Sequence, residues 1–225
     1  MKKVFKAALV ATMVAISVNA NAQLNVGVNV GYVNTDRHLV CDFWAVDISD
    51  LIVTPCDGLL VGFFGYMGIY RNFGFSWGLN YIYSFGSKTI TDPTGMSIKL
   101  KPNDHYLDIP VRLMYSLPLS NDVKLLFFAG PKFAYALAGL TKINVNGLPE
   151  GMEIDEEDDL SFKHYGKEDD ALFKPLNIYI GGGLGIQYKK YNLKAGYDLG
   201  FLNIAKGDKD HAFSTQFYAT LGFMF

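Results

Sequence analysis

The sequence predicts an all-β fold: an eight-stranded antiparallel transmembrane up-and-down β-barrel preceded by a cleaved signal peptide. Residues 213–225 alternate between large apolar residues and small or polar ones, and the sequence ends on Phe225. The same alternation recurs along the chain, and the connections between these segments alternate between long and short. Because successive side chains of a strand point to opposite faces, this pattern predicts an apolar face toward lipid and a polar face toward a barrel interior.

The first 22 residues have the pattern of a secretory signal peptide. A lysine-rich start precedes a mainly apolar run over residues 4–18, and Ala20–Ala22 forms an A-x-A cleavage site. The mature barrel domain is therefore expected over residues 23–225. No later stretch holds roughly 18 consecutive apolar residues, so the prediction of a membrane protein rests on strands.

The first four strands are predicted at residues 24–34, 59–71, 73–85 and 105–115. Three of them alternate clearly, and their outward residues are Leu24, Val26, Val28, Val30 and Tyr32; Phe73, Phe75, Trp77, Leu79, Tyr81, Tyr83 and Phe85; and Leu107, Ile109, Val111, Leu113 and Tyr115. The strand over 59–71 is apolar on both faces, so its register stays open.

The last four strands are predicted at residues 123–137, 176–188, 191–201 and 213–225. Their inward positions carry mostly small or polar residues, among them Gly130, Ala134 and Ala136; Asn177, Gly181, Gly183 and Gln187; Asn192, Gly196 and Gly200; and Ser214, Gln216 and Thr220. Each strand has enough residues for a tilted membrane crossing, which takes roughly 9–11.

The connections predict which end of the barrel faces outward. Long loops are expected over residues 35–57, 86–104, 139–175 and 202–211, and the remaining connections are short. Small bacterial barrels have short periplasmic turns and longer outer loops. Aromatic residues at both ends of the predicted strands match the two belts expected at the membrane interfaces.

The charge balance argues against a nucleic-acid partner. Loss of the signal peptide would leave 17 basic residues against 22 acidic ones, and residues 139–175 alone hold ten acids and four bases. Without a basic patch, nucleic-acid binding is not expected. The acidic run 155–159 has the carboxylates that calcium prefers, but it lacks the order of an EF-hand loop, and a solvated loop is the preferred interpretation.

Two cysteines fall in one predicted loop. In an exported protein, Cys41 and Cys56 are expected to form a disulfide. Two free thiols are the alternative, and zinc is disfavoured because only His38 lies nearby.

Charged residues on the inward faces predict the main polar site. Eight strands enclose a lumen that side chains can fill, and buried charges must pair. We expect a lumen ion-pair network, with a narrow polar conduit as the alternative, formed by Asp108, Arg112, Lys124, Lys132, Lys194 and Asp198.

No motif indicates catalysis, a metal or a cofactor. The four histidines lie in or beside predicted loops without a recognisable catalytic partner, and the glycine run 181–185 lies inside a strand without a P-loop lysine. The protein is therefore expected not to be an enzyme and to need no cofactor.

Several strands resemble those of the PorT-like outer-membrane β-barrel family. The segment Tyr106–Tyr115 resembles its YLxIPxxxxY strand, Phe128–Pro131 its xGP strand, Gly182–Ile186 its glycine-rich strand and Tyr197–Ile204 its YxxGLxNI strand. The resemblance covers roughly residues 23–225. It implies a small OmpA- and OmpX-like barrel in the bacterial outer membrane.

Three functions follow from this interpretation. The resemblance implies a structural or secretion-accessory barrel that contacts outer-membrane lipid and other envelope or secretion proteins. A surface binding protein or adhesin that uses its outer loops is the first alternative. A membrane-embedded hydrolase or acyltransferase is the second. The oligomeric state is not predicted.

Overall fold

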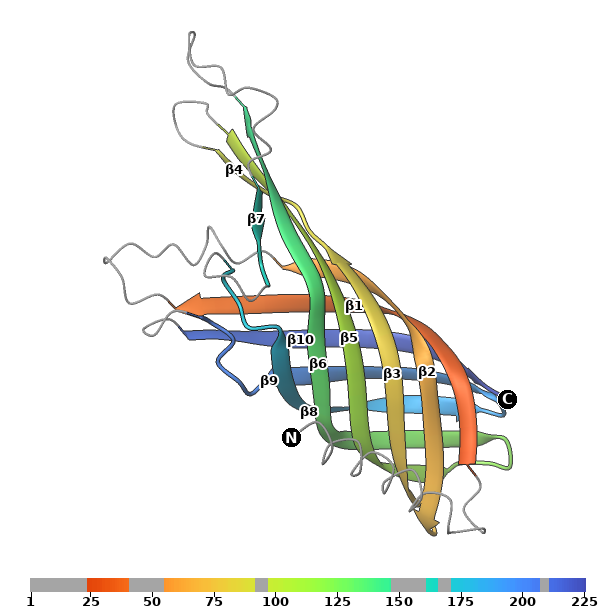
Figure 1. Ribbon diagram of the computed structural model, residues 1–225. Helices are drawn as coiled ribbons and strands as arrows, with labels where there is room; N and C mark the ends of the chain where they lie inside the picture. Colours follow the sequence, from red (N-terminus) through yellow and green to blue (C-terminus); the bar gives the residue numbers. More distant parts are fainter. Residues whose placement is uncertain (1–23, 41–54, 92–96, 147–160, 166–170, 207–210) are drawn as a thin grey trace, which may run out of the picture.

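Eight antiparallel strands close into a ring, as the sequence predicts (Figure 1). The computed structural model describes residues 24–40, 55–91, 97–146, 161–165, 171–206 and 211–225. The strands of the ring are β1 (Leu24–Val40), β2 (Cys56–Tyr70), β3 (Phe73–Phe85), β5 (Ser97–Pro118), β6 (Val123–Asn146), β8 (Leu176–Tyr188), β9 (Tyr191–Gly200) and β10 (His211–Met224). Pairing of β10 with β1 closes the ring. Residues 1–22, the predicted signal peptide, lie outside the described residues. Among the residues that are described, no helix is long and apolar enough to cross a membrane.

The two faces of the strands divide as the alternation predicts. Leu184 and Leu221 are 60% and 54% exposed on the outside, whereas Asp108 and Gln216 are each 1% exposed in the interior. The open register of β2 is settled by its neighbours, because Val61 pairs with Val30 and with Tyr81. Its odd-numbered residues from Leu59 to Phe63 therefore face outward.

The start of β1, the C-terminus and the short turns lie at one end of the barrel. Met224 pairs with Gly27, and the Phe225 amide donates to the Val26 carbonyl at 3.0 Å. Arg71 and Lys189 sit in the two tightest turns with φ of 49° and 52°, a left-handed conformation that two-residue hairpins require. By the usual arrangement of such barrels this is the periplasmic end.

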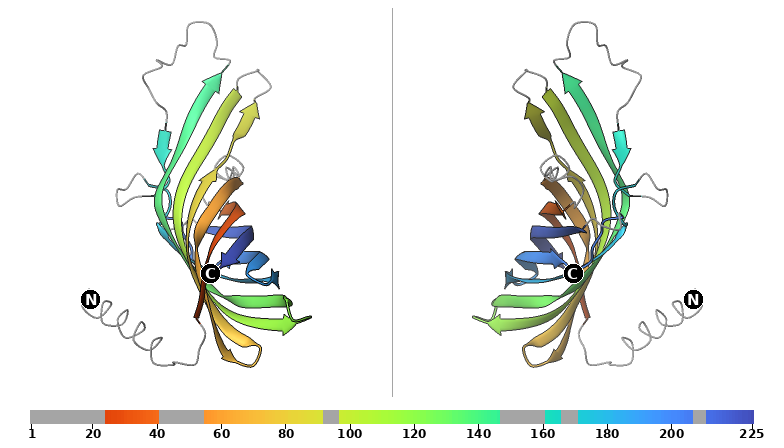
Figure 2. Two further views of the ribbon diagram at one scale, coloured as in Figure 1. Left: turned by 90° about the vertical axis from the view of Figure 1, so that its right-hand side faces the viewer. Right: turned by 90° about the vertical axis from the view of Figure 1, so that its left-hand side faces the viewer.

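The opposite end carries an extension that the sequence analysis missed. Strands β5 and β6 have 22 and 24 residues, about twice what a membrane crossing needs. Beyond the barrel they pair with β4 (Lys88–Thr91) and β7 (Ser161–Lys163). We call this four-stranded unit, residues 88–91, 97–104, 139–146 and 161–163, the projecting sheet; Figures 1 and 2 show it rising from the barrel.

Three predicted loops are therefore partly wrong, because residues 35–40, 97–104 and 139–146 are strand. The alternation of β5 continues there, with Leu100 and Asp104 buried and Lys101 exposed. The outward residues turn polar once the strand has left the apolar band. An apolar pattern therefore locates the membrane crossing and not the end of the strand.

Because the apolar band faces lipid, a charged residue placed in it should strongly lower the stability of the barrel. Leu184 lies four residues from the periplasmic rim residue Tyr188, near the middle of the band. Leu184→Arg should lower the free energy of unfolding in lipid vesicles by about 2–4 kcal/mol, measured by urea titration. Leu119→Arg is the matched control, because Leu119 is 57% exposed in a periplasmic turn. Equal losses in both variants would contradict a lipid-facing band.

Candidate functional site

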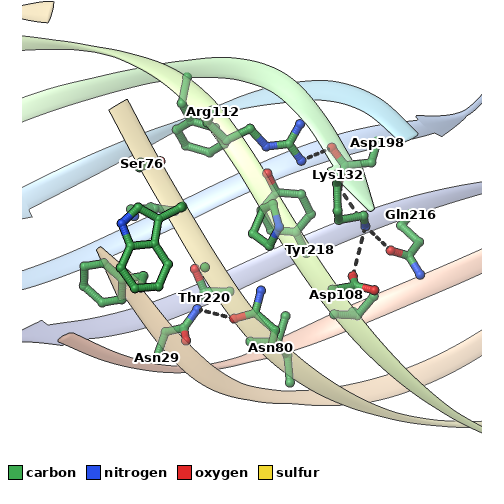
Figure 3. Close-up of a pocket in the computed structure, with 18 of the residues that line it drawn as sticks. Asn29, Ser76, Asn80, Asp108, Arg112, Lys132, Asp198, Gln216, Tyr218 and Thr220 are labelled. Atoms are coloured by element: carbon green, nitrogen blue, oxygen red, sulfur yellow. Dashed lines mark hydrogen bonds and ion pairs between the residues drawn. The ribbon is translucent and has the colours of Figure 1, made fainter. Parts of the chain in front are cut away.

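Four buried charged side chains meet in the barrel interior and form the central cluster: Asp108, Arg112, Lys132 and Asp198 (Figure 3). Arg112 Nη2 lies 2.6 Å from Asp198 Oδ1, and Lys132 Nζ lies 2.9 Å from Asp198 Oδ2 and 3.3 Å from Asp108 Oδ2. Each side chain is at most 5% exposed. Two cations face two anions, so the cluster is formally neutral, as burial of charge demands.

Glycines make room for the Arg112 guanidinium. Its Nη1 donates to the backbone carbonyl of Gly130, and also to that of Gly181 at 3.1 Å. Gly130 has a φ of 151°, and a Cβ there would lie 2.4 Å from the Val111 carbonyl oxygen. A Cβ on Gly181 would lie 2.1 Å from Asp198 Oδ1. Gly130 belongs to the segment 128–131 that carries the family resemblance, and the cluster gives this glycine a physical reason.

Polar and aromatic side chains complete the surroundings of Lys132. Its ammonium donates to Gln216 Oε1, and Gln216 Nε2 donates to Thr35 Oγ1 at 3.0 Å. The same ammonium lies 4.3 Å from the centre of the Tyr179 ring, a favourable cation–π distance. The network therefore links β5, β6, β8, β9, β10 and β1 across the lumen.

A small cavity lies beside the central cluster. Its volume is about 70 Å³, and its lining includes Asn29, Asn80, Arg112, Lys194 and Tyr218. A water molecule occupies roughly 30 Å³ in the liquid. The cavity thus has the scale of a few water molecules and is far smaller than the roughly 300–1,000 Å³ of typical ligand sites.

The six predicted network residues do not all meet. Lys194 lies apart, with its ammonium 4.6 Å from the centre of the Phe64 ring. Lys124 is exposed near the start of β6, because its inward position falls at the periplasmic rim. Cys56 is buried at the start of β2, whereas Cys41 and the acidic run 155–159 lie outside the described residues. The disulfide stays a prediction.

A second polar group, the outer cluster, closes the other end of the lumen. It comprises Arg37, Asp104, Tyr106, His164 and Tyr165. Arg37 forms an ion pair with Asp104 and donates to Tyr106 Oη at 2.8 Å. His164 Nδ1 lies 2.6 Å from Asp104 Oδ1, and the Tyr106 and Tyr165 hydroxyls are 2.8 Å apart. Burial raises the pKa of the Tyr165 hydroxyl, which therefore keeps its proton at neutral pH.

Segments after β7 and β9 pack over this cluster. The Phe173 amide donates to the His164 carbonyl at 2.8 Å, and the Lys174 amide donates to the Ile204 carbonyl at 2.7 Å. Phe173, Ile204, Ala205 and Ala212 form a small buried core with Tyr165 against it. We call residues 164–165, 171–175 and 203–205 the cap, because they pack over the outer cluster.

The outer cluster holds a hydrogen-bonded series in the order of an acyl-transfer triad. Asp104 contacts His164 Nδ1, and His164 Nε2 lies 2.5 Å from Thr141 Oγ1. Asp, His and a hydroxyl in this order activate a nucleophile in hydrolases. Thr141 is only 3% exposed, however, so its hydroxyl is not accessible to a substrate carbonyl in this arrangement. The geometry favours a clamp that holds the cap.

Sequence reasoning missed the outer cluster because its residues fell in predicted loops. Arg37 falls in the predicted loop over 35–57 and Asp104 in the predicted loop over 86–104. One signal was available, since Asp104, Tyr106 and Asp108 continue the inward positions of a single strand. No comparable signal marks His164, because the strand before it, β7, has only three residues and is too short to show an alternation.

Removing one member of the central cluster should expose the cost of an unpaired buried charge. Asp198→Asn leaves Arg112 and Lys132 without their shared anion. It should lower the free energy of unfolding by at least about 3 kcal/mol, measured by urea titration of the vesicle-inserted protein. Asp108→Asn is the matched control and should cost about 1–2 kcal/mol, because Lys132 keeps Asp198. Equal losses of unfolding free energy in the two variants would contradict the role of Asp198 as the anion shared by Arg112 and Lys132.

The outer cluster predicts a local effect without a global one. His164→Ala removes the link from Asp104 to Thr141 and should speed protease cleavage within residues 161–175, while the heat-modifiable migration of the folded barrel is unchanged. His105→Ala is the control, because His105 lies outside the lumen against Tyr81 and Tyr83. Unchanged cleavage in the His164 variant would contradict the clamp.

Comparison with known proteins agrees with this architecture. The model of the outer membrane protein beta-barrel domain family matches residues 17–206. Curated proteins give no match. Similar solved structures include Ail, the attachment invasion locus protein of Yersinia pestis, with 10% identity, 89% of this chain and 98% of that chain covered, and a TM-score of 0.40. Neisserial surface protein A shows 12% identity, coverage of 88% and 97%, and a TM-score of 0.39.

LpxR from Salmonella typhimurium shows 9% identity, coverage of 89% and 100%, and a TM-score of 0.30. These likenesses carry no functional argument at such values. The family match covers most of the sequence and agrees with the closed ring and its apolar outside. The chain therefore belongs to the outer membrane protein beta-barrel domain family and is a protein of the bacterial outer membrane.

Proposed function

We propose that this protein is a non-enzymatic, non-conducting anchor that presents the projecting sheet as a binding surface outside the cell. The observation that carries the proposal is the length of β5 and β6, which continue as paired strands well beyond the barrel. A protein that only filled the membrane would not need this ordered extension.

The filled interior supports the role of an anchor. The cavity beside the central cluster measures about 70 Å³, and a cavity next to the outer cluster measures about 10 Å³. Ion pairs and hydrogen bonds cross the lumen at both levels. Opening a path for a solute would require breaking buried ion pairs, which is costly.

The projecting sheet has features of a surface exposed to water. Its outward side chains include the exposed Thr89, Lys101, Asn103 and Lys142. Its edge strands β4 and β7 have only four and three residues, and short edges limit unspecific strand pairing. This combination fits selective contact with a partner through side chains.

The secretion-accessory function implied by the PorT-like resemblance stays a prediction, as do the PorT-like label and the absence of catalysis. A secretion component would act through contacts in the membrane or on its periplasmic side. An adhesin would act through the projecting sheet. The two proposals therefore differ in the part of the molecule that they require.

A trimmed variant separates these functions. Residues 88–101 and 143–161 would each be replaced by a two-residue turn, which keeps Asp104, Thr141 and His164. Cells lacking the chain would be complemented with the full or the trimmed protein. We expect the trimmed protein to insert and show heat-modifiable migration, but to lose the adhesion of cells to immobilised host-matrix proteins and to other bacterial cells.

The profile of secreted and surface-anchored proteins serves as the second readout. It should be the same with the full and the trimmed protein, and in cells lacking the chain. Loss of exported cargo in cells lacking the chain, together with unchanged adhesion, would contradict the binding proposal and support the secretion-accessory one.

A further inference from the structure

An open groove of about 840 Å³ lies on the outside of the molecule, where the projecting sheet leaves the barrel. The pairing between β5 and β6 shifts in register at this place. His105 pairs with Ala138 and Tyr106 pairs with Ala136, so Leu137 is an extra residue in β6. Such a bulge bends its strand. The groove begins at this bend, where His105 and Leu137 line it, and continues along the projecting sheet to Lys99 and Lys142.

The lining of the groove is strongly basic. It includes Lys99 and Lys101 of β5, Lys142 of β6 and Lys163 of β7, and none of the described residues that line it is acidic. Lys101 and Lys142 occupy directly paired positions on adjacent strands. Both side chains therefore lie on the same face of the sheet, next to each other. Three of the lysines are exposed, and Lys99 is half-buried.

The membrane boundary lies immediately below these lysines. Tyr81, Tyr83 and Phe85 of β3 and Tyr135 of β6 point outward at the outer end of the apolar band, and His105 lies against the two tyrosines. Aromatic residues of this kind mark the level of lipid headgroups. Asn103 pairs with Phe85, and Lys101 is the next outward residue of β5, roughly 7 Å farther along the strand.

We propose that this lysine groove binds the phosphate groups of a phosphorylated glycolipid in the outer leaflet of the membrane. The lysine ammonium groups supply charge-assisted hydrogen bonds to phosphate oxygens, and the apolar side chains below them contact the acyl chains of the same lipid. Basic residues next to a membrane crossing are a general means of binding anionic headgroups. The bound lipid holds the base of the projecting sheet on the membrane surface.

The position of the groove selects a lipid over a soluble polyanion. A soluble ligand gains nothing from the adjacent apolar band, whereas a lipid occupies both surfaces at once. The acidic run 155–159 of the same chain is another candidate occupant by charge. The three occupants give different results in one binding experiment.

The experiment uses the folded full chain in a neutral detergent and measures binding of diphosphorylated lipid A by native mass spectrometry and calorimetry. The test variant is Lys99→Gln/Lys101→Gln/Lys163→Gln. The matched control is Lys124→Gln/Lys189→Gln/Lys190→Gln, which removes three exposed lysines at the periplasmic end. We expect the test variant to bind roughly tenfold more weakly or worse, and the control to bind like the unchanged protein.

Further probes identify the occupant. Lipid A without phosphates should bind far more weakly, and heparin, a soluble sulfated polymer, should compete poorly. Equal binding by the test variant, or heparin binding as tight as that of lipid A, would overturn the proposal. So would lipid binding that appears only after the run 155–159 is changed to Asn and Gln, because the acidic run would then occupy the groove.

This inference goes beyond the proposed function and is tested separately from it. The test variant keeps the strands of the projecting sheet, so its failure to alter lipid binding would leave the adhesion experiment unaffected. Conversely, unchanged adhesion by the trimmed protein would contradict the proposed function, but it would not bear on lipid binding by the full chain.

Discussion

Pairing of charges inside a narrow lumen is the constraint on which the rest of this structure depends. The Asp198 carboxylate forms ion pairs with Arg112 and Lys132, and Lys132 also forms an ion pair with Asp108. An uncompensated charge at this depth would cost several kcal/mol. Each strand that contributes to the cluster is thereby fixed in register, because a shift by one residue would turn its inward charge toward lipid.

Other features of the barrel follow from this requirement. Gly130 and Gly181 offer carbonyl oxygens to Arg112 and leave space that a Cβ would fill. The outer cluster repeats the arrangement nearer the cell exterior, where Arg37 and His164 share Asp104. With the lumen filled at two levels, the parts available for interaction are the outside of the barrel and the projecting sheet. A binding role assigned to that sheet and a lipid site at its base are consistent with this division.

The sequence was most informative where lipid imposes a strict alternation. The bounds of β3 and β8 agree with the predicted ranges 73–85 and 176–188, because both strands end close to the apolar band. Prediction failed for β5 and β6 above the membrane, where the outward residues turn polar, so that an apolar outward face no longer marks the strand. Alternation alone predicts inward positions for Asp108, Arg112, Lys132 and Asp198. It predicts the same for Lys124, which is exposed, because alternation does not tell how far a residue lies from the rim.

The most direct test of this account is a planar-bilayer recording of the full, folded chain. A lumen filled by paired charges at two levels predicts a silent membrane, without discrete conductance steps at any applied voltage that the bilayer tolerates. Reproducible unitary steps from the unchanged protein would contradict the account. They would show that the central and outer clusters line a conduit and do not close the barrel.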